Sequence, residues 1–296
     1  MGGNLAHGGE NDERVGPPLG AASARRLRAG RGKPRPYMTA MVKPEIKIFP
    51  DLEHLSWAAA TRFEELARIK ALEKQPFTAA LSGGSTPKRL FELLGSPTFA
   101  GRVRWQNVYL FQVDERCVPP DDPRSNYRMI RQALLDHTPL PQENFHRLAG
   151  EKSDLEQACR QYEEQMARVL LPPASGWPRL ELVLLGMGPD GHTASLFPGT
   201  AALEEQKAWV CPNYVEKLKT HRLTMTLPVL NTAANIIFMV SGADKADVLR
   251  AVLEGPPGQF PAQRVQPVSG RLSWFLDEAA AHRLSAASVD SRRGDS

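Results

Sequence analysis

Short apolar runs and amphipathic segments alternate along the chain from residue 45 to residue 281. The run from Leu180 to Leu185 is strongly apolar, which is typical of a central parallel strand buried on both faces. In the segment 52–69, apolar residues recur at spacings of three and four, which predicts a helix with one buried face. Strands that alternate with helices form βαβ units, so the pattern predicts an α/β fold with a mostly parallel sheet covered on both faces.

The same reading gives the limits of the predicted elements. The predicted strands are 45–49, 77–81, 105–113, 180–185, 223–227 and 235–240. The predicted helices are 52–69, 87–94, 125–135, 155–169, 243–253 and 274–281. No repeat or linker interrupts the series, so we expect one α/β domain at 42–285. In such sheets ligands bind beyond the carboxyl ends of the strands, so residues directly after each strand are the first candidates for a site.

Two polar tails flank this domain. Residues 1–41 are rich in Gly, Ala, Arg and Pro and carry the whole net charge of +4, so we expect a disordered basic extension. A transit peptide and translation from Met38 or Met41 are alternatives, although the acidic residues at 10–13 disfavour the first. Residues 286–296 are expected to form a second tail.

Composition limits the partners that we expect. Because the net charge of +4 lies in the extension and the remainder is neutral, the sequence does not predict a nucleic-acid partner. The chain lacks an apolar run of about 18 residues, so we expect no membrane span. The three cysteines, Cys117, Cys159 and Cys211, have no metal-ligand or disulfide spacing, which favours a reducing compartment and a cytoplasmic location.

The first candidate motif is a glycine-rich turn directly after the predicted strand 77–81. Paired glycines allow close approach of a ligand to the backbone, and the N–H groups at the start of the following helix attract phosphate. A plain turn that caps the helix is equally compatible with this stretch taken alone. The candidate phosphate-binding residues are Ser82, Gly83, Gly84, Ser85 and Thr86.

Two further motifs follow strands. Asp114, Glu115 and Arg116, with Asn126 after the next loop, fit either a ligand-facing rim or a surface salt bridge with a helix cap. In the third motif, Asp190 and His192 lie in a glycine-rich loop after the strand 180–185. The Asp190 carboxylate can orient the His192 imidazole, which suits a general base at neutral pH, whereas Pro189 and the lack of a later acidic residue disfavour dinucleotide binding.

Two basic residues later in the chain matter if the substrate is anionic. Arg222 precedes the predicted strand 223–227, and Lys245 lies at the start of the predicted helix 243–253. Either could pair with a phosphate group, Arg222 in a bidentate fork and Lys245 as a point charge. From spacing alone, a solvated surface position is favoured for both.

Together these stretches resemble the glucosamine-6-phosphate isomerase/6-phosphogluconolactonase family over residues 45–282. The matching pieces are SGGSTP at 82–87, DERCVP at 114–119, GMGPDGHTASLFPG at 186–199 and RLTMTLPVLN at 222–231. The resemblance implies a Rossmann-like three-layer α/β/α sandwich that needs no nucleotide cofactor and no metal. It also implies hydrolysis of 6-phospho-D-glucono-1,5-lactone, a phosphorylated sugar lactone, in the oxidative pentose phosphate pathway. We expect a monomer or weak dimer.

The resemblance also suggests roles for the candidate residues. His192, oriented by Asp190, would deprotonate the attacking water, while Arg116 would stabilise the oxyanion. The turn at 82–86, with Arg222 and Lys245, would hold the phosphate. Asp114 and Asn126 would hold sugar hydroxyls or brace the loop.

Two alternatives stay open. The first is a sugar-phosphate isomerase or deaminase of the same fold. The deaminases resemble this chain in their Asp-Gly-His turn but carry a proton-relaying Glu shortly after it, where this sequence has Phe197. The second is a sugar-phosphate sensor without catalysis, which would keep the phosphate loop but would not need the Asp-x-His turn.

Overall fold

The computed structural model describes residues 44–170, 176–286 and 288, which belong to one compact unit at 40–296. The predicted tail at 1–41 lies outside the described residues, as does most of the predicted tail at 286–296. Within the described residues, no helix combines the length and apolar character needed to cross a bilayer.

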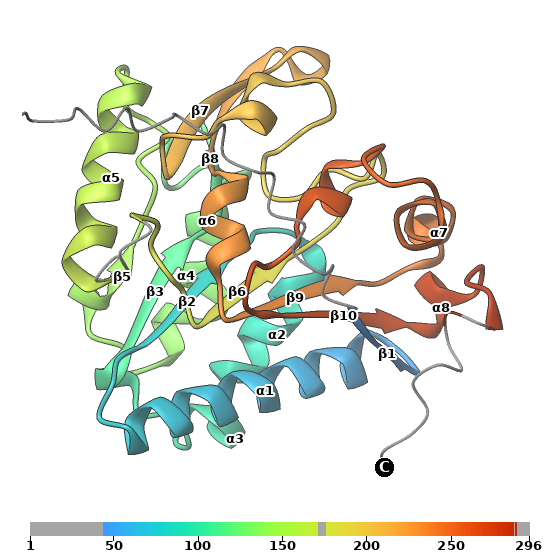
Figure 1. The fold of residues 1–296 in the computed structure, drawn as a ribbon. Coiled ribbons are helices and arrows are strands. Elements are labelled where there is room, and N and C mark those ends of the chain that lie inside the picture. The colour runs from blue at the N-terminus through green and yellow to red at the C-terminus, as the bar shows by residue number, and fades with distance from the viewer. Residues whose placement is uncertain (1–43, 171–175, 287, 289–296) are drawn as a thin grey trace, which may run out of the picture. The chain divides into compact units, whose positions relative to one another are not determined.

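A seven-stranded sheet, in which every neighbouring pair is parallel, forms the middle layer (Figure 1). In spatial order its strands are β1 (Glu45–Phe49), β10 (Arg271–Asp277), β9 (Asn235–Val240), β6 (Leu182–Leu185), β2 (Phe77–Leu81), β3 (Val108–Gln112) and β5 (Phe145–His146). The chain moves outward from β2 toward β3 and from β6 toward β9, so the strand order reverses between β2 and β6. Ligands bind at such a switch point.

Helices cover both faces of this sheet, as the alternating strand residues require. Leu182 and Leu184 of β6 pack into one apolar core, whereas Val183 and Leu185 pack into the other. The first core is covered by α1 (Leu52–Leu72), α2 (Ser85–Leu94), α3 (Pro97–Ala100) and α4 (Asn126–Ala133). The second core is covered by α5 (Leu155–Val169), α6 (Leu227–Thr232), α7 (Ala246–Glu254) and α8 (Glu278–Ala281).

The predicted three-layer α/β/α fold with a mostly parallel sheet is therefore confirmed. Short 3-10 turns connect the elements: η1 (Trp105–Asn107), η2 (Leu135–His137), η3 (Gln142–Asn144), η4 (Ala201–Glu204), η5 (Glu216–Leu218), η6 (Ala243–Lys245) and η7 (Pro261–Arg264).

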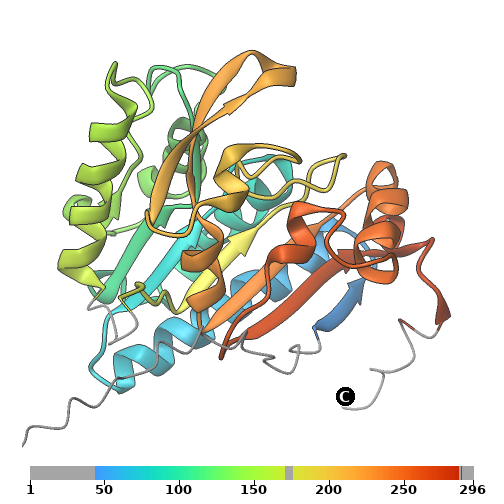
Figure 2. The ribbon, with the colours of Figure 1, turned by 45° about the horizontal axis from the view of Figure 1, so that its top comes forward.

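A second, smaller sheet was not predicted. It is antiparallel, with the strand order β4 (Asp114–Arg116), β8 (Thr220–Met225) and β7 (Val210–Val215). The η5 turn joins β7 to β8, and Figure 2 shows this hairpin standing apart from the large sheet. The predicted strand 223–227 corresponds to β8, which starts three residues earlier, so Arg222 lies inside a strand rather than before one.

The predicted helix at 274–281 is wrong in its first half. Residues 274–277 belong to β10, an interior strand of the large sheet, and only Glu278–Ala281 is helical. Trp274 stacks on Phe238 of β9 with ring centroids 4.0 Å apart. A short apolar run fits a buried strand or a helix equally well by periodicity, so only packing against β9 and β1 decides its conformation. The predicted strand 105–113 likewise begins with the η1 turn, and α2 begins at Ser85, two residues before its predicted start.

Candidate active site

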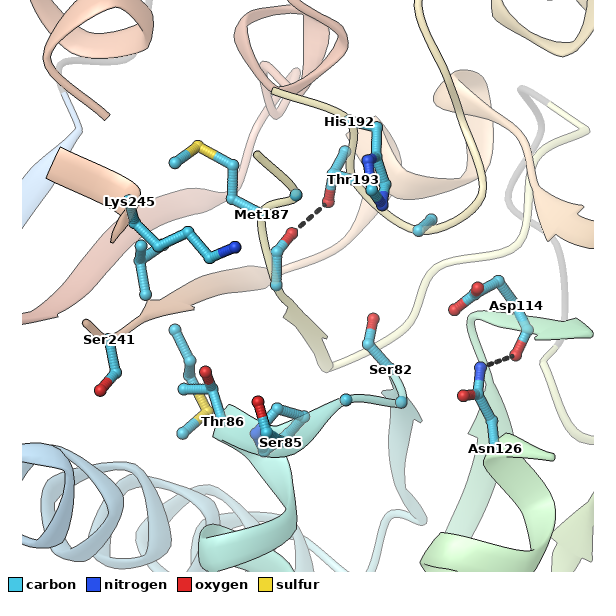
Figure 3. A pocket seen from close by; sticks show the side chains of 18 of the residues that line it. Ser82, Ser85, Thr86, Asp114, Asn126, Met187, His192, Thr193, Ser241 and Lys245 are labelled. Carbon is cyan, nitrogen blue, oxygen red and sulfur yellow. Dashed lines mark hydrogen bonds between the residues drawn. The ribbon is translucent and has the colours of Figure 1, made fainter. Parts of the chain in front are cut away.

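The loops that follow β2, β6 and β9, together with β4, enclose a cavity of about 200 Å³ (Figure 3). It lies at the carboxyl edge of the large sheet, where the strand order reverses. All of the predicted site residues except Asp190 and Arg222 line its wall. The lining set is Ser82, Gly83, Gly84, Ser85, Thr86, Asp114, Arg116, Asn126, His192 and Lys245, joined by Pro87, Gly186, Met187, Gly188, Thr193, Ala194, Met239, Val240 and Ser241.

The glycine-rich turn presents the start of α2 to the cavity. Gly84 is the N-cap residue, has φ +118° and makes no side-chain capping bond, so the first N–H groups of α2 keep their hydrogen-bonding capacity. These groups and the helix dipole favour an anion at this point. Gly83 approaches Asn126 so closely that an added Cβ would lie 1.7 Å from its Oδ1 atom.

Two buried polar atoms beside this turn have no hydrogen-bond partner within the described residues. They are Ser82 Oγ and Asn126 Oδ1, and both residues line the cavity. A buried polar atom without a partner is costly, so both atoms are suited to contacts with a bound ligand.

Of the two neighbouring acidic residues, Asp114 faces the cavity and Glu115 does not. The Oδ2 atom of Asp114 accepts a hydrogen bond from Ser195 Oγ at 2.7 Å, and its backbone carbonyl accepts one from Asn126 Nδ2 at 2.9 Å. Glu115 is buried and accepts from the backbone N–H groups of Asn126 (2.7 Å) and Tyr127 (2.8 Å). Glu115 therefore fixes the start of α4, which leaves Asp114 as the carboxylate available to a ligand.

His192 and Asp190 form the pair that the sequence predicted. The Nδ1 atom of His192 lies 2.5 Å from Asp190 Oδ1, and Asp190 itself does not line the cavity. Figure 3 shows the imidazole beside the cavity, across from Ser82. Since Nδ1 is engaged by a carboxylate, that atom carries the proton, and Nε2 is left with a free lone pair. The ring of Phe197 stacks on the imidazole at a centroid distance of 4.0 Å.

The pKa of His192 is lowered to about 4, and burial is the largest cause. The positive charges of Lys245, Arg222 and Arg116 contribute to this decrease, whereas the Asp114 carboxylate opposes it. The imidazole is consequently neutral at pH 7, which is the form that can accept a proton.

Of the three predicted cationic site residues, two line the cavity and Arg222 does not. Within the described residues, the cavity wall has two cationic side chains, Arg116 and Lys245. Lys245 ends the η6 turn, and Figure 3 shows its side chain reaching toward the middle of the cavity. Arg222 is off the wall, opposite Arg116 in the β4–β8 pairing, and both burial and Arg116 lower its pKa. A direct contact of Arg222 with phosphate stays a prediction, with less support than Lys245.

Sequence reasoning missed several residues of this site. Ser241 directly follows β9 and lines the cavity, so the strand-end rule could have found it. Ser195, which hydrogen-bonds to Asp114, lies only three residues after His192. Lys217, whose Nζ contacts Asp190 Oδ2, is separated from it by 27 residues and gave no local signal. The described residues also contain no cluster of His, Cys, Asp or Glu suited to a metal ion.

Fold and site define an α/β enzyme in which a helix start suited to an anion shares the cavity with a carboxylate-oriented histidine. The chain belongs to the glucosamine-6-phosphate isomerase/6-phosphogluconolactonase family, whose model matches residues 50–274. It is 40% identical to a 6-phosphogluconolactonase of Synechocystis sp. over 214 residues, which cover 72% of this chain and 86% of the relative. It is 33% identical to a Haemophilus influenzae 6-phosphogluconolactonase over 238 residues, covering 80% of this chain and 98% of the relative.

Solved structures agree with this assignment. The 6-phosphogluconolactonase of Trypanosoma brucei superposes with a TM-score of 0.73 at 29% identity, over 82% of this chain and all (100%) of that chain. The family predicted from the motifs is thereby confirmed.

Proposed function

We propose that this chain hydrolyses 6-phospho-D-glucono-1,5-lactone to 6-phosphogluconate in the oxidative pentose phosphate pathway. Relatives with 33–40% identity carry the name 6-phosphogluconolactonase, which confirms the predicted class of lactone-hydrolysing enzyme. The structural observation that carries the proposal is the 2.5 Å contact between Asp190 and His192 at the edge of a cavity with an uncapped helix start.

The charges around the cavity indicate how the substrate lies. The start of α2 and Lys245 form a positive end, which suits the 6-phosphate. Asp114 and the Oδ1 atom of Asn126 are acceptors, which suit sugar hydroxyls and would repel phosphate. We therefore propose that the phosphate binds at the Lys245 end and that the sugar hydroxyls face Asp114.

The reaction follows from the neutral imidazole. His192 Nε2 takes a proton from a water molecule, whose oxygen attacks the C1 carbonyl of the lactone. Asp190 holds the imidazole by Nδ1 and stabilises its charged form, as in other carboxylate–histidine pairs. Arg116 and backbone N–H groups stabilise the oxyanion of the tetrahedral intermediate.

Collapse of this intermediate breaks the bond between C1 and the ring oxygen. The leaving ring oxygen receives the proton from His192, which regenerates the neutral base and gives the open-chain acid. Atoms and charge therefore balance over the two steps. The proposed reaction needs no cofactor because a lactone is already an activated ester.

The isomerase or deaminase alternative has less support. Phe197 occupies the position where the resemblance places the relaying Glu of the deaminases, and its ring packs against His192 instead of offering a carboxylate. A monomeric glucosamine-6-phosphate deaminase shares the fold at 23% identity and a TM-score of 0.68.

We also propose that the protein is a cytoplasmic monomer or weak dimer, which cell fractionation and sedimentation would test.

The decisive test is hydrolysis of lactone generated in place by glucose-6-phosphate dehydrogenase, with spontaneous hydrolysis subtracted. Pure protein should hydrolyse it well above background. The His192→Asn variant should lose about 10²–10⁴-fold in kcat, which is the usual contribution of a positioned base. His221→Asn, a change at an exposed histidine of β8, is the matched control and should retain full activity.

Folded protein with no rate above background would contradict the lactonase proposal and favour the sensor alternative. Full kcat in His192→Asn would contradict the assignment of the base.

A further inference from the structure

The tip of the β7–β8 hairpin reaches back to the loop that carries the catalytic base. Lys217 lies in the η5 turn at this tip, and its Nζ atom contacts Asp190 Oδ2. The same ammonium group lies 4.9 Å from the centroid of the Phe197 ring. Lys217 is half exposed and does not line the cavity.

Both partners of Lys217 support His192. Asp190 uses its Oδ1 atom for His192 Nδ1 at 2.5 Å, while its Oδ2 atom is engaged by Lys217. The ring of Phe197 stacks on the imidazole of His192, with the two ring centroids 4.0 Å apart and the ring planes tilted by 24°. A single ammonium group thus touches the carboxylate that orients the imidazole and the ring that packs against it.

We propose that Lys217 is a positioning residue, which acts through Asp190 and Phe197 to fix the orientation and the proton affinity of His192. The proposal rests on the proposed function, in which His192 is the base. A carboxylate with both oxygens engaged cannot rotate freely, so Oδ1 stays directed at Nδ1 and the lone pair of Nε2 stays available. Lys217 also offsets part of the negative charge that would otherwise stabilise the imidazolium.

Several other charges face His192 and must be considered with Lys217. Asp190 and Asp114 favour the protonated imidazole, whereas Lys245, Arg222 and Arg116 disfavour it. Phe197 is uncharged and excludes water from one face of the ring. Removing Lys217 leaves all of these groups in place but removes the ammonium group that offsets the negative charge of Asp190. The direction of change is therefore fixed: His192 becomes easier to protonate.

The first experiment measures the protonation of His192 directly by ¹⁵N NMR titration of the imidazole in substrate-free protein. Lys217→Met should move the titration upward by roughly 0.2–0.7 pH units, the shift expected for one half-exposed ion pair. Lys217→Arg, which keeps the charge, should return the midpoint toward that of the unmodified protein. Lys219→Met removes the same charge from the same hairpin at an exposed site and is the matched control, with no expected shift.

The second experiment uses steady-state kinetics with the phosphorylated lactone. In Lys217→Met, kcat should fall by about tenfold, a part of the 10²–10⁴-fold contribution of the base, because the imidazole is less firmly oriented. KM should stay the same, since Lys217 does not line the cavity. The acid limb of kcat/KM should move upward with the NMR midpoint.

An unchanged His192 titration in Lys217→Met would overturn the proposal, and so would an equal shift in Lys219→Met. A raised KM with an unchanged titration would also overturn it, because that result would indicate a structural role of the hairpin. The titration needs no lactone. Absence of lactonase activity would therefore overturn the proposed function independently of the coupling between Lys217 and His192.

Discussion

The two sheets of this protein contribute to the active site in different ways. The large parallel sheet supplies loops that line the cavity: the turn after β2, the loop after β6 and Ser241 after β9. In the small antiparallel sheet, β4 supplies Asp114 and Arg116 to the cavity wall, whereas Asn213 of β7 and Thr224 of β8 hydrogen-bond to Ser195 in the loop after β6. The large sheet and β4 therefore line the cavity, whereas β7 and β8 hold the loop after β6.

The loop between Thr193 and Thr200 illustrates this support. Asn213 of β7 donates from Nδ2 to the backbone carbonyl of Ser195 at 2.8 Å and to Thr200 Oγ1 at 3.0 Å. The N–H of Ser195 in turn donates to Thr224 Oγ1 of β8 at 3.2 Å. The hydroxyl of Ser195 also donates to Asp114 of β4, so Ser195 is hydrogen-bonded to all three strands of the small sheet.

The proposed base His192 lies in a loop of the large sheet, so crowding this loop should have the largest effect in this comparison. A Cβ on Gly188 would lie 2.0 Å from Cε1 of His192, so Gly188→Ala must displace the imidazole. We expect a loss of about 10²-fold in kcat, as for a misplacement of about 1 Å. Gly101→Ala, where an added Cβ meets nothing within 4 Å, is the control. Equal kcat in both variants would contradict this placement of His192.

The two sheets also offer different cations to the substrate phosphate. Lys245→Ala should raise KM for the phosphorylated lactone by about 10–150-fold, the equivalent of a charge-assisted contact of about 1.5–3 kcal/mol. Arg222→Ala, on the small sheet and off the cavity wall, should have a smaller effect. An unphosphorylated lactone should not distinguish Lys245→Ala from the unmodified protein. A larger effect of Arg222→Ala would reverse the comparison and place the phosphate beside β8.

The supporting role of the small sheet predicts a loss of stability rather than of binding. Asn213→Ala leaves the buried carbonyl of Ser195 without its donor, which should cost about 1–3 kcal/mol of unfolding free energy. For a domain of this size that corresponds to a decrease in Tm of roughly 2–4 °C per kcal/mol. Tyr214→Ala, at an exposed neighbour on the same strand, should change Tm much less. Calorimetry of both variants would show whether the small sheet stabilises the loop.

The pH dependence is the mildest expected effect. The pKa of His192 is about 4 in the folded chain, below the ordinary value of 6.5, so the folded state binds fewer protons between these values. Stability should therefore decrease as the pH falls from 6.5 to 4, and kcat/KM should be flat near neutrality with an acid limb at about pH 4. Bound phosphate offsets the nearby cations, so the limb of kcat should lie at a higher pH. An acid limb of kcat/KM at 6.5 would show that His192 is well solvated.

Much of the large sheet was predictable from local patterns. Apolar runs defined β2, β6 and β9, and the residues after them, such as Ser82 and His192, were correctly expected at one edge. The prediction failed for Trp274–Asp277, since four apolar and acidic residues carry no decisive periodicity. Alternation along β4 is also too short to indicate from sequence which of Asp114 and Glu115 faces the cavity.

The sequence by itself determined the fold class, the family and most of the residues that line the cavity. These follow from hydrophobic periodicity and from glycine-rich turns, which are properties of neighbouring residues. Only the tertiary structure decided that Glu115 holds α4, that Arg222 pairs with Arg116 between β8 and β4, and that Lys217 reaches Asp190. Such contacts join residues far apart in the chain, and their geometry depends on how the two sheets pack. No local pattern encodes that packing.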